Sequence, residues 1–413
     1  MSENENNFNE LEAYKAILFE KQRIEDFLRA ENKNLWQHLN NYKKLPFFNL
    51  YIYISEKLQN FILFFKQTRT SWVSDLESNN SRQPKVDKNF TIQALFVLPS
   101  NRIEIGGLQT AYKLAVNLSN LGLNSKVICV TSDPSSEIND IFLDHESINL
   151  VETVNLIIAC GAESISLADQ LGTKYRAKKI LLMQGPDHYF TPDWENSKNF
   201  VSAIRSYDYV VTISHFLFKL ASQYRSNNII FTPLGYDNQI FKIFPGKRTN
   251  QIVVACRSNI EKGLKILLPQ IPEIRRKGWR VVGFGDLNDP QMAEVFDEFF
   301  GRVNNIRLYE IFSKSKILLD PSLIEGLGLI PLEAAASGVV PIVAKRHSYE
   351  GFFKNGERPF VEIDDFQNPV EVLKAIDKAD KMDNHKVAEI VKDANWENGL
   401  EIFVNQIKQI LSI

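Results

Sequence analysis

The sequence has few cysteines, almost no net charge and no long apolar run. Its 413 residues include three cysteines, Cys129, Cys160 and Cys256, which lie far apart within apolar stretches. This usage excludes a disulfide framework or a cysteine-based metal site and is typical of a reducing compartment. No apolar run approaches the ~20 residues that a transmembrane helix needs. The formal net charge of −2 lacks the basic excess of nucleic-acid-binding proteins, so we expect no nucleic-acid partner.

The polar, acidic start of the chain, MSENENNFNE, lacks the features of a secretory signal. With 44% hydrophobic and 24% charged residues, the composition is that of an ordinary globular protein. A chain of this length is sufficient for two or three domains. We therefore expect a cytoplasmic protein.

Residues 1–88 differ in pattern from the rest of the chain. Residues 9–44 contain no proline or glycine, and their apolar residues recur at helical spacing, which predicts a long amphipathic helix or coiled coil. After Pro46, residues 47–66 are rich in large apolar and aromatic side chains. We expect this surface to pack on the protein's own body or on a second subunit in a homodimer. Contact with the inner face of a membrane is the alternative, although the segment lacks a basic excess.

From residue 91 onward, short apolar runs alternate with loops and helical stretches, and the pattern restarts at residue 251. Apolar runs buried on both faces and separated by helices predict a parallel, doubly wound α/β sheet. We expect a Rossmann-like domain at 89–240, a second one at 241–395 and a C-terminal helix at 396–413. Ligands of such sheets bind beyond the carboxyl ends of the strands. Two sheets that face each other across a cleft would therefore hold two substrates.

Three loops that follow predicted strands contain pairs of glycines. Gly106 and Gly107 precede a predicted helix, where free backbone N–H groups and the helix dipole favour a phosphate. The loop VVGFGDLN lacks the third glycine of a dinucleotide fingerprint, so it is weak evidence for NAD. Gly326 and Gly328 precede a further predicted helix. A single loop of this kind is usually a turn, but three loops at strand ends favour a ligand site.

Charged residues also follow two of the predicted strands. Arg257 directly follows a strand and Lys262 precedes a helix, which suits the binding of a diphosphate, although two solvated surface charges are the alternative. Glu325 and Glu333 flank the third glycine pair, Gly326 and Gly328. Glu333 stands in the apolar helical stretch IPLEAAAS, where a charged group requires a partner. That partner is either a ligand hydroxyl or a buried arginine or lysine.

These motifs together resemble those of the retaining family-4 glycosyltransferases, which have the GT-B fold. The stretch EGLGLIPLE carries two glutamates separated by seven residues, as in the family's signature. The stretches GGLQTA, TPLGYDNQIF, ACRSNIEKG, VVGFGD and LLDPSLIEGLG resemble the other motifs of the family in the same order. The resemblance covers roughly residues 92–345. The departures are Leu234 and Tyr236, which replace the usual Asn and Val between the two domains.

The resemblance implies how a nucleotide would be held. Arg257 and Lys262 would neutralise the leaving diphosphate, and Gly106 and Gly107 would approach the phosphates from the other domain. Glu333 would bind the pentose of the nucleotide. The chain contains no D-x-D motif, so we expect neither a metal nor another cofactor. The cations and helix dipoles would supply the charge instead.

The resemblance also implies which groups act at the donor sugar. Glu325 would hold the sugar in the catalytic position, together with backbone amides of the glycine loop. These amides belong to Gly326, Leu327, Gly328 and Leu329. Front-face attack by the acceptor, with retention at the sugar carbon, is the mechanism that the family implies.

Residues 180–195, ILLMQGPDHYFTPDWE, resemble a segment of bacterial rhamnosyltransferases that build cell-surface rhamnans. This implies dTDP-β-L-rhamnose as the nucleotide-sugar donor, and a growing surface glycan or lipid-linked glycan, such as an S-layer glycan, as the acceptor. Asp187 and His188 form a titratable pair there, which predicts that they accept the acceptor's proton or orient the sugars. Two other functions stay open: a nucleotide-sugar epimerase, and a non-catalytic assembly protein with a vestigial transferase body.

Overall fold

The computed structural model divides the chain between Lys85 and Val86 into two units, and the residues described here belong to the second. They are residues 91–102, 106–132, 140–187, 194–257, 262–287, 290–345, 347–349, 353 and 357–412. The helical segment predicted at 1–88 lies outside them, and so does His188.

The first half of the described chain forms a sheet of seven parallel strands, in the order β3-β2-β1-β4-β5-β6-β7. The strands are β1 (Thr91–Ser100), β2 (Ser125–Thr131), β3 (Phe142–Leu143), β4 (Thr153–Cys160), β5 (Lys178–Met183), β6 (Tyr209–Thr212) and β7 (Ile229–Phe231). The central strand β1 is buried on both faces from Ala94 to Leu98, which explains its continuous apolar run.

The second half forms a sheet of six parallel strands, in the order β10-β9-β8-β11-β12-β13. The strands are β8 (Gln251–Cys256), β9 (Arg280–Gly285), β10 (Glu298–Phe299), β11 (Ile317–Asp320), β12 (Val340–Ala344) and β13 (Val361–Ile363). In the first sheet the chain runs from β1 outward to β3 at one edge, and it then crosses to β4 on the other side of β1. The second sheet follows the same path from β8 to β10 and then to β11. The order therefore reverses between β1 and β4 and between β8 and β11, and such switch points are where doubly wound sheets bind ligands.

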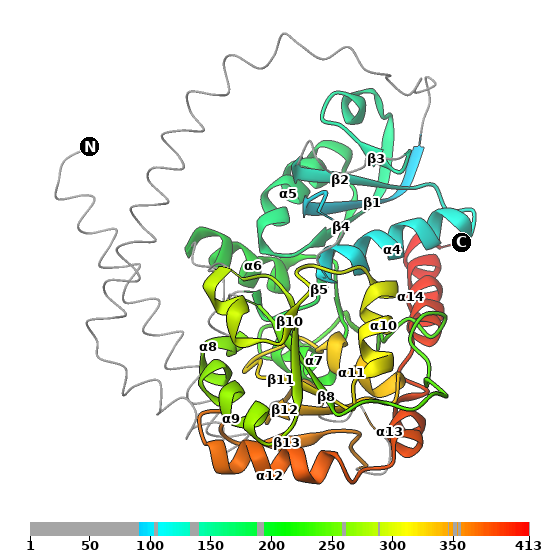
Figure 1. Ribbon diagram of the computed structural model, residues 1–413. Coiled ribbons are helices and arrows are strands. Elements are labelled where there is room, and N and C mark those ends of the chain that lie inside the picture. Colours follow the sequence, from blue (N-terminus) through cyan, green and yellow to red (C-terminus); the bar gives the residue numbers. More distant parts are fainter. Residues whose placement is uncertain are drawn as a thin grey trace, which may run out of the picture. The chain divides into compact units, whose positions relative to one another are not determined.

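Helices connect the strands of each sheet and cover its faces (Figure 1). In the first sheet unit they are α4 (Gly106–Asn120), α5 (Ile165–Tyr175), α6 (Trp194–Ser206) and α7 (His215–Ser222), with the short turns η1 (Ser147–Leu150) and η2 (Ala162–Ser164). In the second they are α8 (Leu264–Leu267), η5 (Leu268–Gln270), α9 (Ile271–Arg276), η6 (Pro290–Val295), α10 (Asn305–Lys314), α11 (Leu329–Ala336), η7 (His347–Tyr349), α12 (Pro369–Ala379) and α13 (Asn384–Val391).

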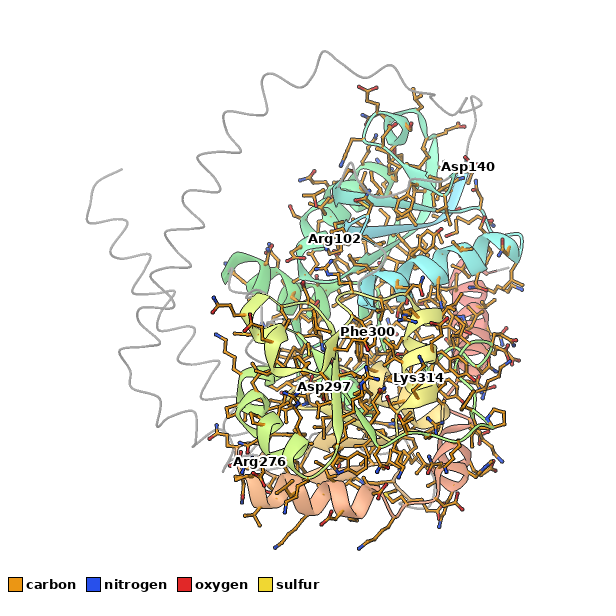
Figure 2. All side chains as sticks on the ribbon, viewed as in Figure 1. Arg102, Asp140, Arg276, Asp297, Phe300 and Lys314 are labelled. Atoms are coloured by element: carbon orange, nitrogen blue, oxygen red, sulfur yellow. The ribbon has the colours of Figure 1, made fainter. Side chains whose placement is uncertain are left out.

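Local sequence fixes where several of these helices begin. Four side chains each accept a hydrogen bond from a backbone N–H of the first turn of a helix: Asn304 at α10, Asn368 at α12, Asp383 at α13 and Asn395 at the last helix, α14 (Trp396–Leu411). Such caps satisfy N–H groups that have no partner inside the helix. The side chains in Figure 2 fill the space between helices and sheets, and the exposed Asp140 and Arg276 stand on the outside.

The last helix, α14 (Trp396–Leu411), follows the second sheet unit in sequence but packs on the first. Phe403 is fully buried, and its ring centroid lies 6.5 Å from that of Phe96 in β1. Lys178 Nζ at the start of β5 donates to the carbonyl of Ile410 over 2.8 Å. The two sheet units are thus joined both by the connection after β7 and by this returning helix.

The connection between the sheet units is pinned against the start of α14. The N–H of Tyr236 donates to the carbonyl of Ala394 over 3.1 Å, and the N–H of Trp396 donates to the carbonyl of Tyr236 over 2.7 Å. A β-carbon at Gly235 would lie 1.8 Å from the Ala394 oxygen, so only glycine fits there. Leu234 and Tyr236, the two departures from the family pattern, are both buried in this connection.

Candidate active site

Arg257 lies at the switch point of the second sheet, directly after β8. Its Nη2 lies 2.9 Å from the hydroxyl of Ser322 and 3.3 Å from Oδ1 of Asp320, the last residue of the neighbouring strand β11. The Asp320 side chain is fully buried. A buried carboxylate is stable only beside a cation and hydrogen-bond donors, so Asp320 holds the guanidinium of Arg257 at the carboxyl ends of β8 and β11.

Glu325 brings the second predicted cation, Lys262, into the same cluster. Oε1 of Glu325 lies 2.8 Å from Nη2 of Arg257 and 3.0 Å from Nζ of Lys262. The Glu325 side chain is 11% exposed, and the side chains of the two cations are 29% and 18% exposed. With Asp320, the cluster holds two positive and two negative charges, so its formal charge is zero. An anion that entered this site would compete with Glu325 for both cations.

The glycine loop that follows Glu325 touches the first sheet unit. A β-carbon at Gly326 would lie 1.8 Å from the carbonyl oxygen of Gln184, which follows β5, so this approach requires glycine. The carbonyl of Gly326 accepts a hydrogen bond of 2.6 Å from the hydroxyl of Ser214. Gly328 has φ 84°, a left-handed conformation that favours glycine, and it forms the N-cap of α11. The loop is therefore part of the contact between the two sheet units.

Glu333 occupies the second turn of α11, whose other side chains are apolar. Burial raises the pKa of its carboxyl to about 7. The positive charges of Lys113 and Arg257 oppose this shift, and the negative charge of Asp237 adds to it. Within the described part of the chain, the Glu333 side chain forms no ion pair, because Lys113 Nζ is bound to Asp237 at 2.9 Å. Lys113 belongs to α4 and Asp237 to the connection between the sheet units.

Gly106 and Gly107 form the start of α4 on the other side of the contact. Both are exposed, and a β-carbon on Gly106 would meet no atom within 4 Å. A β-carbon on Gly107 would lie 3.8 Å from Oε1 of Gln184, the residue that meets Gly326. The structure thus brings the predicted glycine loop at 106–107 close to the one at 326–328 through Gln184.

Asp187 lies near the switch point of the first sheet. Its Oδ2 accepts a hydrogen bond of 3.2 Å from the N–H of Ala162, just after β4. Burial raises the pKa of the Asp187 carboxyl to about 7, with a smaller contribution from the charge of Glu163, although the Ala162 N–H opposes the shift. A pKa near neutrality suits a group that exchanges protons with a substrate. The catalytic role of Asp187 stays a prediction, as does that of His188.

Sequence reasoning missed the residues that hold the predicted ones in place. Asp320 is the last residue of the run ILLD in β11, and Arg257 directly follows the neighbouring strand β8. A charged residue at the end of an otherwise apolar strand is a signal that sequence reasoning could have used. Ser214 follows the run YVVTI, and this pattern predicts a helix cap. Nothing in the local sequence indicates its hydrogen bond to the carbonyl of Gly326. The pair of Lys113 and Asp237 joins residues 124 positions apart, which no local pattern indicates.

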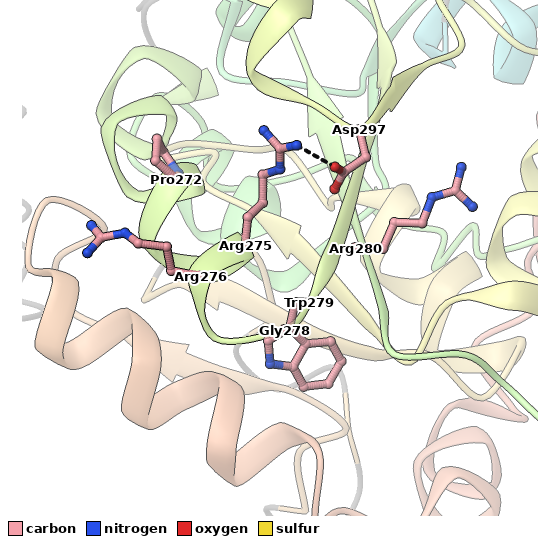
Figure 3. Close-up of a pocket in the computed structure, with 7 residues that line it drawn as sticks. All are labelled: Pro272, Arg275, Arg276, Gly278, Trp279, Arg280 and Asp297. Carbon is pink, nitrogen blue, oxygen red and sulfur yellow. Dashed lines mark hydrogen bonds and ion pairs between the residues drawn. The ribbon is translucent and has the colours of Figure 1, made fainter.

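A surface hollow elsewhere in the second sheet unit is separate from this cluster. Figure 3 shows Arg275 directed toward Asp297, and the two form an ion pair of 2.6 Å. Arg276 and Arg280, which also line the hollow, pair with Glu273 and Glu298. Arg280 begins β9, so the hollow lies at the amino end of that strand, opposite the carboxyl ends where the cluster sits. Its arginines are already paired.

Residues 249–378 match the protein family described as "Glycosyl transferases group 1". Several solved structures share the fold over most of the chain. Sucrose-phosphate synthase from Thermosynechococcus elongatus is 14% identical with a TM-score of 0.64, and the match covers 78% of this chain and 99% of that one. HepE from Anabaena, in complex with UDP and glucose, is 14% identical with a TM-score of 0.59, over 78% and 98%. A glycosyltransferase from Rickettsia africae is 15% identical with a TM-score of 0.58, over 78% and 99%.

The solved structures confirm the predicted GT-B fold, and the family match is confined to residues 249–378 in the second sheet unit. No curated protein sequence matches the chain. Among the described residues, no helix is long and apolar enough to cross a bilayer. No group of three or more metal-ligating side chains occurs within the same residues. The rhamnose donor and the retaining course of the reaction stay predictions.

The raised pKa of Glu333 predicts a pH-dependent effect of Glu333→Gln on stability. The unfolded state loses this proton near pH 4.5 and the folded state near pH 7, so ionisation of Glu333 costs stability progressively as pH rises through that window. Glutamine does not ionise. Glu333→Gln should therefore raise the free energy of unfolding by about 2 kcal/mol more at pH 8 than at pH 5.

Chemical denaturation of the full chain at the two pH values measures this difference. Glu310→Gln is the matched control, because its side chain is 52% exposed on α10 and paired with Arg307, and it should give no such pH-dependent gain. An equal effect of Glu333→Gln at both pH values would show that the carboxyl is not held neutral by its surroundings.

Proposed function

We propose that this chain is a glycosyltransferase that moves a sugar from a nucleotide-sugar donor to a glycan acceptor. The observation that carries the proposal is the cluster of Arg257, Lys262 and Glu325 at the β8–β11 switch point. The cluster lies within the residues that match the glycosyl transferases group 1 family. It also faces the first sheet unit through the Gly326 contact, so a donor bound there would meet an acceptor held by the other unit.

The donor diphosphate would exchange places with the Glu325 carboxylate. In this structure, the two cations are neutralised by Glu325 and Asp320. A diphosphate that entered between Arg257 and Lys262 would take over the interactions of Glu325 and release its carboxylate toward the sugar, as the role of Glu325 at the sugar requires. Asp320 is fully buried and would stay in place to hold Arg257. The cations would then stabilise the charge that develops on the leaving diphosphate.

Glu333 would accept a hydrogen bond from the pentose hydroxyls of the nucleotide. Its carboxylate forms no ion pair within the described residues and lies one helical turn from the glycine loop, so a ligand hydroxyl is the partner that fits the observation better than a buried cation. Binding of that hydroxyl would favour the ionised carboxylate and offset part of its desolvation.

We propose a retaining course for the reaction, on the basis of the sequence resemblance. The bond between the sugar carbon and the phosphate oxygen breaks, and the acceptor oxygen forms its bond to the same face of that carbon. The acceptor proton passes to the departing phosphate oxygen, which leaves as the diphosphate. Arg257 and Lys262 would hold that phosphate in position, and Asp187 would orient the acceptor or take part in the proton transfer.

We propose dTDP-β-L-rhamnose as the donor, on the basis of the resemblance of residues 180–195 to rhamnosyltransferases. A growing surface glycan or lipid-linked glycan would be the acceptor. UDP-glucose is the competing donor, because HepE from Anabaena is described in complex with it. The residues of this segment up to Asp187 lie at the end of β5, beside the Gly326 contact, where they would be able to distinguish donors or acceptors.

Substitutions of the three clustered residues should have different effects on binding and on turnover. Lys262→Ala and Arg257→Ala should each weaken binding of the nucleoside diphosphate and lower turnover by about 100-fold, because each removes a charge that stabilises the leaving group. Glu325→Gln should bind the diphosphate more tightly, by about tenfold, because it frees both cations, while it still loses sugar transfer.

Calorimetry with dTDP and with UDP measures the affinities, and release of nucleoside diphosphate from the donor measures turnover. Lys265→Ala is the matched control, because Lys265 is an exposed residue of α8 close to Lys262 in sequence. Wild-type affinity in both alanine variants would remove the diphosphate assignment. Weaker binding in Glu325→Gln would show that Glu325 contacts the nucleotide directly and does not compete with it.

A comparison of nucleotide sugars in a thermal shift assay tests the identity of the donor. A ligand at 100 times its dissociation constant stabilises a protein by about 2.7 kcal/mol. We expect dTDP-rhamnose to raise the melting temperature more than UDP-glucose, and dTDP more than UDP. The reverse order would replace the rhamnose donor with a UDP-sugar. Formation of an epimer of the donor in the absence of acceptor would indicate an epimerase, and failure to bind any nucleotide sugar would favour the vestigial transferase body.

We propose that transfer needs no metal ion, because the two cations of the cluster are placed to neutralise the diphosphate. EDTA should therefore leave turnover within about twofold of the untreated enzyme, since no D-x-D carboxylate pair is present to hold Mg²⁺ against a diphosphate. Turnover is measured with and without chelator, and then after addition of Mg²⁺ or Mn²⁺. Loss of activity with EDTA that either ion restores would contradict this charge compensation.

A further inference from the structure

Two buried hydroxyls bind the backbone of the glycine loop, residues 325–329. Ser214 Oγ donates to the carbonyl of Gly326, and Tyr349 Oη donates to the carbonyl of Gly328, each over 2.6 Å. Ser214 is fully buried and Tyr349 is 2% exposed. Hydroxyls that are this well buried form fixed hydrogen bonds, so the loop is held at two alternate peptide groups.

The position of a carbonyl fixes the direction of the N–H in the same peptide group. The peptide unit is planar and trans, so its C=O and N–H point in opposite directions. The carbonyl of Gly326 belongs to the same peptide group as the N–H of Leu327. Likewise, the carbonyl of Gly328 belongs to the same group as the N–H of Leu329. Ser214 and Tyr349 therefore turn these two N–H groups away from themselves.

The two N–H groups are available for a ligand. Within the described part of the chain, neither Leu327 nor Leu329 donates its N–H to another residue. Leu329 is the first residue of α11, where backbone N–H groups have no partner inside the helix and the dipole favours negative charge. Glu325, which binds the two cations, opens the same loop.

Ser214 reaches this loop from the other sheet unit. It caps α7, because its Oγ also accepts a hydrogen bond of 3.2 Å from the N–H of Leu217. A hydroxyl has one proton to donate and lone pairs to accept with, so both interactions form together. α7 also packs on η7, the turn that ends in Tyr349. The close approach of Gly326 to Gln184 brings the two units together at the same point.

We propose that Ser214 and Tyr349 are positioning residues that direct the N–H groups of Leu327 and Leu329 at the sugar of the bound donor. Ser214 makes this arrangement depend on contact between the two sheet units, whereas Tyr349 maintains it from within the second unit. The inference rests on the proposed function, since it assumes that the glycine loop holds a nucleotide sugar. Neither residue touches the reacting atoms, and both act through the backbone of the loop.

Tyr349→Phe and Ser214→Ala test the proposal. Tyr349→Phe removes one hydroxyl and keeps the ring, whose centroid lies 4.5 Å from that of Phe360. Each variant should lower kcat/KM for the donor by about tenfold, because a misdirected N–H loses its interaction with the sugar. The affinity for dTDP, which lacks the sugar, should stay within twofold of wild type. Ser214→Thr keeps the hydroxyl and should restore turnover to within about twofold.

The assays use the full chain with dTDP-rhamnose and UDP-glucose, and they follow release of nucleoside diphosphate by slow hydrolysis of the donor, in which water takes the place of the glycan acceptor. Tyr175→Phe is one control, because it removes a hydroxyl that binds the carbonyl of Ile148 away from the cluster. Asn304→Ala is the control for loss of a helix cap, at the start of α10. Both controls should keep wild-type turnover with either nucleotide sugar.

The outcomes separate this inference from the proposed function. If the wild-type protein binds and turns over neither nucleotide sugar, the proposed function fails. If the wild-type protein is active and Tyr349→Phe matches it in turnover, only the positioning role fails. Equal losses of dTDP affinity and turnover in Tyr349→Phe would also overturn it, because they would indicate a general structural role. If Ser214→Ala does not fold, Tyr349→Phe and Ser214→Thr decide the question.

Discussion

The guanidinium of Arg257 is shared between the fully buried carboxylate of Asp320 and the carboxylate of Glu325, and the geometry of the site depends on this arrangement. Asp320 is fully buried at the end of β11 and so requires a cation, which Arg257 supplies directly after the neighbouring strand β8. The sheet order places β8 beside β11, which brings Arg257 within reach. Arg257 then binds Glu325 together with Lys262, and Glu325 fixes where the glycine loop begins. The order of the strands thus brings the charged residues together, and their ion pairs in turn fix the start of the glycine loop.

The same arrangement explains how the two clustered cations are both paired. Two positive charges held close together repel each other, and the carboxylate of Glu325 offsets both of them. Lys113 and Asp237 form a second pair beside Glu333, and this pair ties α4 to the connection between the sheet units. The charges that a nucleotide would meet therefore come from both units and from the segment that joins them.

Much of the fold follows from local patterns in the sequence. Apolar runs such as IQALFVLP and QIVVAC are buried on both faces, and they predicted two parallel sheets because few other arrangements bury both faces of a strand. Arg257, Lys262 and Glu325 were also identified from their places at strand ends. The ion pairs that these residues form with one another could not be predicted, because the sequence does not reveal which cation a carboxylate binds. The resemblance implies a contact of Glu325 with the donor sugar and no ion pair with Arg257 or Lys262.

The remaining features depend on contacts between distant parts of the chain. Ser214 lies 112 residues from Gly326, and the pattern around it indicates only a helix cap. Phe403 packs on Phe96 because α14 returns to the first sheet unit. The amphipathic sequence of α14 predicts that one face of the helix is buried, but it does not indicate which surface covers that face. The choice of donor depends on how side chains of the first unit meet the sugar, and short motifs do not encode that shape.

A crystal structure of the protein with bound nucleoside diphosphate, dTDP or UDP as affinity dictates, tests the central claim most directly. The account predicts that the phosphates contact Arg257 and Lys262 and that Arg257 keeps its contact with Asp320. Glu325 would then lie more than about 4 Å from both cations, beyond the range of an ion pair. A bound nucleotide with both Glu325 ion pairs intact, or one seated away from the carboxyl ends of β8 and β11, would contradict it.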